Sequence, residues 1–354
     1  MKKIYYIAVV FAILFLAGCG DGIDLPGVNV ETDLNKIPLP DNNVNLEQVE
    51  LKPSTEPMLH EGLHTEEDFQ RIRDKKAAGE EPWVSAYQLL VESQFSQKTA
   101  DTYPTEWIKR GVSGDENYMN AARGATIAYQ QALRWKIEQD DEYAAKAVEN
   151  LNKWVQTCVG VTGNTNLSLA AGLYGYEFAI AGELLRDYEG WDRADFAAFQ
   201  NWLLKVFYPA NDDFLKRHHD TNALHYWANW CLCNIAAKMA IGIVTDRRDI
   251  YNEGIGHLQT GDTNGRLRRA IYHDYAPDYN FAQWQESGRD QGHTLMCVGL
   301  MGVICQLAWS QGDDFFAYDD NLFMRACEYA ACCNYTNETV PYTTYIWQKQ
   351  SQWG

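Results

Sequence analysis

Basic residues are scarce in this sequence: 30 Lys and Arg stand against 48 Asp and Glu, and the formal net charge is −18. Proteins bind nucleic acids largely through cationic contacts to phosphates, so this balance argues against a nucleic-acid partner. It also argues against a polyanionic polysaccharide unless the binding surface is locally basic. Aromatic residues are abundant instead, with 12 Trp and 21 Tyr. They suffice for a large core and for rings on which sugars could stack.

Two common catalytic motifs are also missing. The sequence has no GxSxG nucleophile elbow and no phosphate-binding loop, so serine-hydrolase and phosphoryl-transfer chemistry lack support. The cysteines after Cys19 show no metal-binding spacing with paired histidines, and we predict no metal site and no cofactor. They lie in apolar, helix-like stretches, which is typical of small buried residues, although a disulfide or two would be compatible with an oxidising compartment. These cysteines are Cys158, Cys231, Cys233, Cys297, Cys305, Cys327, Cys332 and Cys333.

An alternating strand pattern is absent between Thr65 and Asn334, whereas helical spacing of apolar residues recurs throughout. The first predicted helix begins at Thr65, where Thr65-Glu66-Glu67-Asp68 resembles a capping box. The next begins at Pro82, and the others cover 118–136, 142–158, 167–188, 193–207, 222–243, 247–257, 292–310 and 321–334. We therefore predict an all-α domain, most compatible with an α/α toroid, here an incomplete barrel of antiparallel helix pairs with a cleft at one end. A large helical bundle or solenoid is the alternative, since no fixed repeat is visible.

The chain starts like an exported protein. Lys2 and Lys3 precede an apolar run, residues 4–16, that is too short to span a bilayer, and small residues lead to Cys19. This pattern resembles the lipobox of bacterial lipoproteins, in which the cysteine is acylated and anchors the protein to a membrane. We predict a signal peptide at 1–18, a flexible tether at 19–58 and one domain at 59–354, on the periplasmic side, at the outer membrane or at the cell surface. An ordinary cleaved signal is the alternative.

Two polar clusters stand out within the predicted helices. The first runs from His218 to Trp230, and a helix beginning at Asn222 would place Asn222, His225 and Asn229 on one face near its positive end. Such a face favours binding a carboxylate. The alternative is a set of polar residues that cap the helix and satisfy buried partners.

The second cluster, residues 283–294, directly precedes an almost wholly apolar stretch. On a helix Gln285, Arg289 and His293 would align, but two glycines favour a turn into the next helix for part of it. A dense polar patch beside a buried helix indicates a site or an internal ion-pair network. Between the clusters, three arginines at 266–269 stand close to several tyrosines, either as a local basic surface or as a solvated turn.

Three segments, His60 to Trp83, His225 to Trp230 and Gln285 to Thr294, resemble the alginate lyase family of helical-toroid polysaccharide lyases. The similarity extends from about residue 60 to the C-terminus. The resemblance implies β-elimination at a uronic acid: one group neutralises the C6 carboxylate, a base removes the C5 proton and an acid protonates the departing O4. It also implies further helices after residue 347, so that a domain ending at Gly354 would be an incomplete toroid.

The sequence departs from the family pattern at both clusters. Where the family has Asn-Asn-His before Tyr-Trp, this chain has Asn222-Ala223-Leu224 before His225. A loose match puts His293 where the family often has its catalytic tyrosine, so His293 is the expected base, with Arg289 beside the carboxylate; otherwise Tyr275 supplies the phenol. The expected catalytic residues are His225, Arg289, His293 and Tyr275. The expected substrate-binding residues are Asn222, Asn229, Tyr226, Trp227, Gln285, Glu286 and His218.

The leading hypothesis is therefore a membrane-anchored lyase that cleaves a uronate polymer such as alginate, polymannuronate or glucuronan. A glycan-binding lipoprotein that has lost catalysis is a second hypothesis, because the Asn-His pair is displaced. A helical-toroid glycoside hydrolase is a third, with Glu286 and an aspartate as acid and base.

Overall fold

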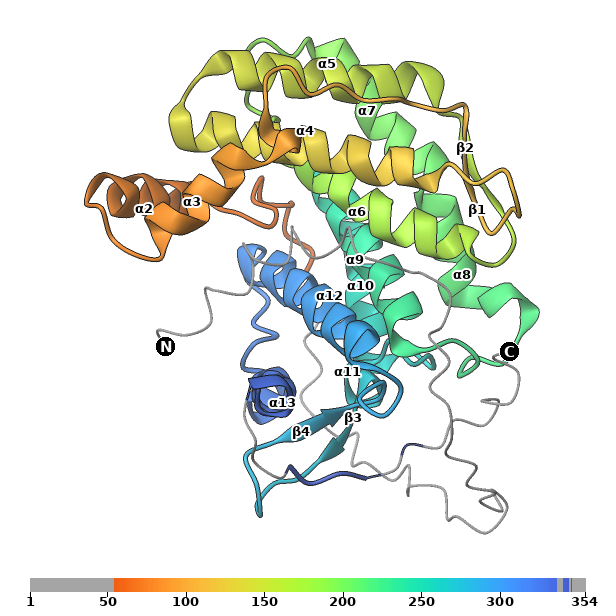
Figure 1. Ribbon diagram of the computed structural model, residues 1–354. Helices are drawn as coiled ribbons and strands as arrows, with labels where there is room; N and C mark the ends of the chain where they lie inside the picture. The colour runs from red at the N-terminus through yellow and green to blue at the C-terminus, as the bar shows by residue number, and fades with distance from the viewer. Residues whose placement is uncertain (1–53, 336–339, 344, 346–354) are drawn as a thin grey trace.

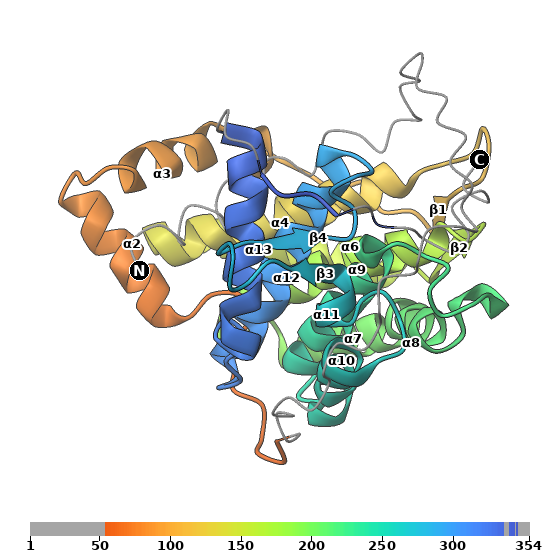
Figure 2. The same cartoon turned by 90° about the horizontal axis from the view of Figure 1, so that it is seen from below.

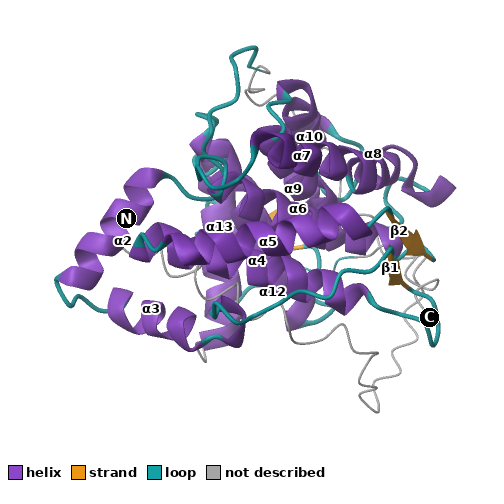
Figure 3. Ribbon diagram, turned by 90° about the horizontal axis from the view of Figure 1, so that it is seen from above, coloured by secondary structure: helices purple, strands orange, loops and turns teal. Residues whose placement is uncertain are grey.

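Helices make up most of the described chain, which covers residues 54–335, 340–343 and 345 of a computed structural model (Figures 1 and 3). The α-helices are α2 (Glu66–Ala77), α3 (Trp83–Glu92), α4 (Tyr118–Glu138), α5 (Asp141–Thr157), α6 (Leu167–Leu184), α7 (Arg193–Val206), α8 (Tyr208–Arg217), α9 (Ala228–Val244), α10 (Arg248–Thr260), α11 (Leu267–Ala270), α12 (Gln291–Ser310) and α13 (Tyr318–Tyr335). Two 3₁₀ turns, η2 (Gln94–Ser96) and η3 (His218–Asp220), join them. The predicted all-α fold class is confirmed, while α8 and the short α11 were not predicted.

The helix starts show how local sequence sets the elements. At α2, the Thr65 hydroxyl accepts a hydrogen bond from the Asp68 backbone N–H at 3.2 Å, and the Asp68 carboxylate accepts one from the Thr65 N–H at 3.0 Å. This is the predicted capping box.

The core is organised around α9, which packs against α6, α10 and α12 (Figure 1). Every residue of α9 is buried, and α6 is buried on nearly all sides; helices that are apolar all round belong in an interior layer. α4 extends this inner layer beside α6, while α5 covers α4, and α8 and α10 cover α9. α12 has the length and hydropathy of a membrane span, but more than half of its apolar window is buried inside the protein. It is a core helix of the toroid.

Four short strands were not predicted. β1 (Trp107–Arg110) pairs in parallel with β2 (Gly160–Gly163), and β3 (Ile271–Asp274) pairs antiparallel with β4 (Ala282–Trp284). Segments of three or four residues are too short to show an alternating pattern. β1 and β2 lie in the segments that lead into α4 and α6, and the β3–β4 ribbon packs against α13 (Figure 2).

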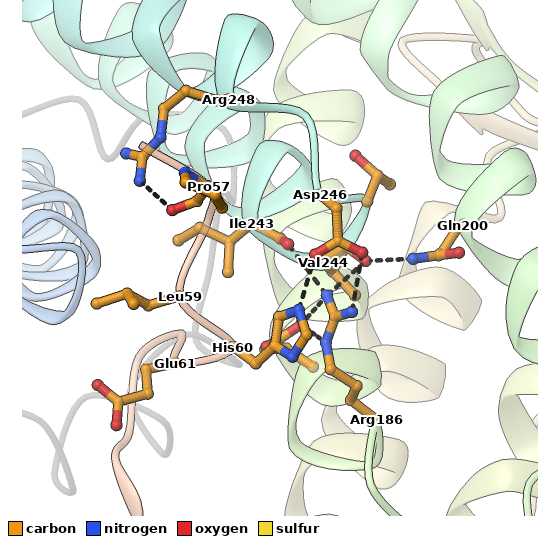
Figure 4. A network of polar contacts seen from close by, with 12 residues as sticks. Pro57, Leu59, His60, Glu61, Arg186, Gln200, Ile243, Val244, Asp246 and Arg248 are labelled. Carbon is orange, nitrogen blue, oxygen red and sulfur yellow. Dashed lines mark hydrogen bonds and ion pairs between the residues drawn. The ribbon is translucent and has the colours of Figure 1, made fainter. Parts of the chain in front are cut away.

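The amino-terminal segment is docked on the carboxyl-terminal end of α9 (Figure 4). Arg186 donates to the Asp246 carboxylate at 3.0 Å and to the last backbone carbonyls of α9, and His60 Nε2 lies 3.1 Å from Asp246. Arg248 donates to two backbone carbonyls of residues 54–58. These five residues were assigned to the tether, but they contact the domain; the rest of the predicted tether and the signal peptide lie outside the described residues.

The cysteines of the described part form no disulfide. Six are buried, and Cys327 is partly so. The interpretation of most of them as small buried apolar residues is confirmed.

Candidate active site

The helix predicted from Asn222 begins six residues later, at Ala228, with Trp227 as its N-cap residue. Residues 222–227 form an irregular turn. Asn222 and His225 therefore do not share a helix face with Asn229, and this prediction is wrong. Asn222 is exposed and His225 is partly exposed, whereas Asn229 is 2% exposed.

The amino end of α9 is capped from a distant segment. The Gln285 side chain accepts a hydrogen bond from the Ala228 N–H at 2.9 Å, and Glu286 accepts one from the Asn229 N–H at 3.1 Å. The Asn229 amide also donates to both Glu286 carboxylate oxygens, at 2.7 and 2.9 Å. Backbone N–H groups at a helix start need such partners. A partner 57 residues away explains why the local sequence misplaced the helix start.

Glu286 is fully buried and organises the second cluster. Arg289 donates to it at 2.8 Å and lies 5.4 Å from the centre of the Trp227 ring, within cation–π range. The Cys297 thiol donates to Glu286 at 3.3 Å, and burial together with this carboxylate raises the pKa of Cys297 well above its usual value. The carboxylate thus holds one loop to α9 and to α12 at once.

Asp290 and His293 form a dyad at the start of α12. Asp290 is the N-cap residue and accepts the His293 N–H at 2.8 Å, and its other oxygen lies 2.6 Å from His293 Nδ1. Burial acts to raise the pKa of Asp290, but the hydrogen bonds from His293 and the charges of His293 and Arg289 lower it below its usual value. The carboxylate fixes the Nδ1–H tautomer, which leaves Nε2 able to accept a proton. The His293 side chain is 29% exposed, so substrate can reach it.

The segment 285–289 is a turn rather than part of a helix. The turn expected from the two glycines is therefore confirmed, and the helical alignment of Gln285, Arg289 and His293 is not what brings them together. Gln285 is 2% exposed and donates to the Tyr345 hydroxyl at 2.7 Å. Asn229, Gln285 and Glu286 were predicted to bind substrate, but their burial makes them the support of Arg289 and the turn.

Tyr275 lies at the end of the β3–β4 ribbon. Its hydroxyl donates to the Gln283 side chain at 2.5 Å and lies 3.1 Å from Thr343 Oγ1. Burial raises its pKa above the ordinary value, so the phenol is protonated at neutral pH and suits an acid better than a base. The rings of Tyr272 and Tyr345 are 4.9 Å apart. They belong to a series of ring contacts that connects Tyr275 with Trp227.

His218 and Tyr226 belong to a buried aromatic cluster with Phe214 and Trp230. His218 is 2% exposed and Tyr226 is 5% exposed. Burial, together with the neighbouring histidines, lowers the pKa of His218 to about 4, so its imidazole is neutral. Both rings are buried against other rings of this cluster, which does not fit the predicted role in contacting substrate. The same holds for Trp227, whose ring already packs against Tyr345 and the Arg289 guanidinium.

The structure thus joins Trp227 and Asn229 to the turn that carries Arg289, and it leaves His225, Arg289 and His293 partly accessible. Sequence reasoning missed Asp290 and Tyr345. Asp290 carried a local signal, because it stands three residues before His293, the N-cap spacing. Tyr345 carried none, since its contacts depend on tertiary packing.

Sequence reasoning also missed that His60-Glu61-Gly62-Leu63-His64 matches the HExxH pattern of zinc proteases. That pattern requires a helix to bring its histidines to one face, and this segment is not helical. His60 faces Asp246, and His64 Nε2 lies 2.6 Å from the Tyr129 hydroxyl. In the part of the chain that the structure describes, no group of three or more His, Cys, Asp or Glu side chains is arranged to hold a metal ion.

Comparison with known proteins gives the family. The family model described as alginate lyase matches residues 72–338. None of the curated proteins matches the chain. Among solved structures, a variant of alginate lyase A1-III complexed with a tetrasaccharide is 14% identical, with a TM-score of 0.60 over 80% of this chain and 82% of that one.

Two further structures agree with this fold. Alginate lyase A1-III from Sphingomonas species A1 is 13% identical, with a TM-score of 0.55 over 78% of this chain and 80% of that one. An alginate lyase from Bacteroides ovatus is 14% identical, with a TM-score of 0.53 over 76% of this chain and 82% of that one. The expected resemblance and the α/α-toroid fold are confirmed. The chain belongs to the alginate lyase family, and it is a polysaccharide lyase.

Proposed function

We propose that this lyase cleaves a uronate-containing polysaccharide, such as polymannuronate or glucuronan, by β-elimination without a redox cofactor. The observation that carries the proposal is the Asp290–His293 dyad, whose partly exposed imidazole follows Arg289 by four residues. The family to which the chain belongs supports the reaction class.

The proposed roles follow from the chemistry of elimination. The C5 proton of a uronate becomes acidic only when the C6 carboxylate is neutralised, and Arg289 supplies that charge. His293 Nε2 then removes the C5 proton, while Asp290 stabilises the imidazolium that forms. The electron pair of the C5–H bond forms the C4–C5 double bond as the C4–O4 bond breaks. O4 takes a proton from the imidazolium or from the Tyr275 phenol, and His225 remains our candidate for a contact to the sugar.

The glycoside-hydrolase alternative does not fit the structure. A general acid must reach the glycosidic oxygen, whereas Glu286 is 0% exposed and accepts hydrogen bonds from Asn229, Arg289 and Cys297. The binding-only alternative rests on a specific observation, because Ala223 and Leu224 occupy the positions of the family's Asn-His pair. It predicts that the protein binds a uronate polymer but releases no unsaturated product.

The experiment is absorbance at the unsaturated-uronate band, with purified protein and polymannuronate, polyguluronate, glucuronan and a neutral glycan. We expect a rise with one uronate polymer that His293→Ala and Arg289→Ala abolish. His60→Ala is the matched control, because this histidine also faces an aspartate but lies at the other end of α9. No rise with any polymer, together with measurable binding to one, would favour the binding-only alternative.

We also propose that the protein is exported and anchored through lipids on Cys19, which lies outside the described residues. The lipobox-like sequence before Cys19 supports this. Mass spectrometry of the amino-terminal peptide from membranes should show an acylated cysteine, and Cys19→Ala should release the protein into the soluble fraction. An unmodified Cys19 in the mature protein would refute the anchor.

A further inference from the structure

Four arginines of the described chain are buried, and one of them differs from the others. Arg134, Arg186 and Arg325, each between 4% and 6% exposed, all pair with carboxylates. Arg110 is equally buried, at 6%, but pairs with no carboxylate in the described chain. Its Nη1 atom is buried without a hydrogen-bond partner among these residues. A buried cation without a counter-charge is costly, because desolvation is not offset.

Arg110 is the last residue of β1, and its side chain faces inward on the same side as the fully buried Ile108. The guanidinium lies 4.7 Å from the centre of the Tyr118 ring at the start of α4. Tyr118 in turn stacks on Tyr174 of α6, with the ring centres 6.4 Å apart. The planar cation is therefore held against an aromatic surface and leaves donors for another group.

This position lies at the same end of the toroid as the proposed catalytic residues. Burial raises the pKa of the Cys233 thiol in α9, and the positive charge of Arg110 partly opposes this rise, so the two side chains lie within electrostatic reach of each other. Cys233 lies one helical turn after Asn229, which is a rise of about 6 Å. On the neighbouring helix, Ser168 in the first turn of α6 lies 2.9 Å from His219 of the loop before α9. Figure 1 shows β1 and β2 beside this end of α6.

We propose that Arg110 binds a carboxylate of the polysaccharide, at a subsite next to the sugar held by Arg289. A guanidinium presents parallel N–H donors that match a carboxylate, and such charge-assisted pairs are strong. A uronate polymer carries one carboxylate on each sugar, so a second sugar offers the missing counter-charge, and the Tyr118 ring offers an apolar surface beside it. This inference rests on the proposed function, because it requires a uronate substrate.

The test compares Arg110→Met with Lys109→Met. Both variants remove one positive charge from β1, but Lys109 is paired with the exposed Asp115 at 2.6 Å. For Arg110→Met we expect the KM for the cleaved polymer, and the Kd for short uronate oligosaccharides by calorimetry, to rise about tenfold or more, while kcat changes little. The Tm without ligand should stay or rise, because an unpaired buried charge is removed. Lys109→Met should leave all these values unchanged.

A structural arginine would behave in the opposite way. Arg134→Met, which breaks a buried ion pair with Glu138, should lower the Tm. If Arg110→Met also lowers the Tm and leaves KM unchanged, or if Lys109→Met raises KM equally, the inference is overturned. Should Arg110→Met fail to fold, Arg110→Lys decides: it keeps the charge without the planar fork, and an unchanged KM overturns the inference.

Failure of the proposed function can be distinguished from failure of the Arg110 subsite. A wild-type protein that cleaves a uronate polymer regardless of Arg110 contradicts the subsite alone. A wild-type protein that binds uronate oligosaccharides without cleaving them, with an Arg110-dependent Kd, supports the subsite and refutes the reaction. Absence of binding to every uronate overturns both.

Discussion

Replacing Glu286 by Gln removes the one negative charge to which Arg289, Asn229 and Cys297 all donate. The shape of the side chain is kept, but one carboxylate oxygen becomes an amide group that donates instead of accepting. At least one donor therefore loses its partner, and Arg289 loses its closer ion pair, while its 3.8 Å contact with the Asp290 carboxylate remains.

The expected loss of stability follows from the burial of the Glu286 ion pair. Breaking a buried ion pair by removing one partner costs about 3–5 kcal/mol. Glu286 is fully buried, but Arg289 keeps 27% of its side chain exposed, so water replaces part of the lost interaction. We therefore expect a loss of about 2–3 kcal/mol in the free energy of unfolding, at or slightly below the lower limit of that range. This corresponds to a Tm lower by about 4–10 °C for a domain of this size.

The assay is denaturant unfolding together with kcat on the cleaved polymer, with Glu149→Gln as control. Glu149 also pairs with two cations, Lys146 at 3.0 Å and Lys153 at 2.8 Å, but it is 51% exposed. Exposed pairs contribute about 1 kcal/mol at most, so this variant should remain near wild type. If Glu286→Gln is as stable as Glu149→Gln and keeps its kcat, then Glu286 does not organise the site.

Two more predictions concern the imidazoles. Asp290→Asn should keep the helix cap, since Asn is also a good N-cap residue. It should nevertheless lower kcat about 100-fold or more, because His293 loses its fixed tautomer. A lowered Tm with unchanged kcat would contradict the dyad. The pKa values of His64, His218 and His257 are lowered to about 4, chiefly by burial. Between pH 6.5 and 4 the unfolded chain therefore binds protons that the native chain does not, and the free energy of unfolding should fall as the pH falls through this range. Tm measured from pH 8 to pH 4 checks this, and His218→Asn should make the decline shallower; a flat profile in the wild type would refute it.

The sequence was informative wherever a structure is set by nearby residues. The capping box at Thr65, the long apolar helices and the turn before α12 depend on contacts within a few positions, and all were predicted. The start of α9 was not, because its cap comes from Glu286 rather than from a local side chain. β1 and β2 were missed because each has only four residues and pairs with a partner 53 residues away in the chain.

The same difference between local and long-range determinants applies to the candidate site. Arg289 and His293 stood out from their polar density, and the spacing of Asp290 to His293 was readable. Burial was not readable, so Asn229, Gln285 and Glu286 were predicted to touch substrate, although the structure turns them inward.

If the protein is anchored through Cys19 as proposed, the docking of residues 54–58 beside the carboxyl-terminal end of α9 has a consequence for its orientation at the membrane. α9 has 17 residues, so its ends are about 25 Å apart, and its other end carries the proposed catalytic loops. A tether that leaves from the docked segment would place that pole of the protein toward the lipid and the opening of the site toward the surrounding medium. An anchored enzyme arranged in this way would meet long polymers from outside without threading them past the bilayer. Fluorescence quenching by lipid-attached quenchers should then be stronger for a probe at residue 252 than for one at residue 222.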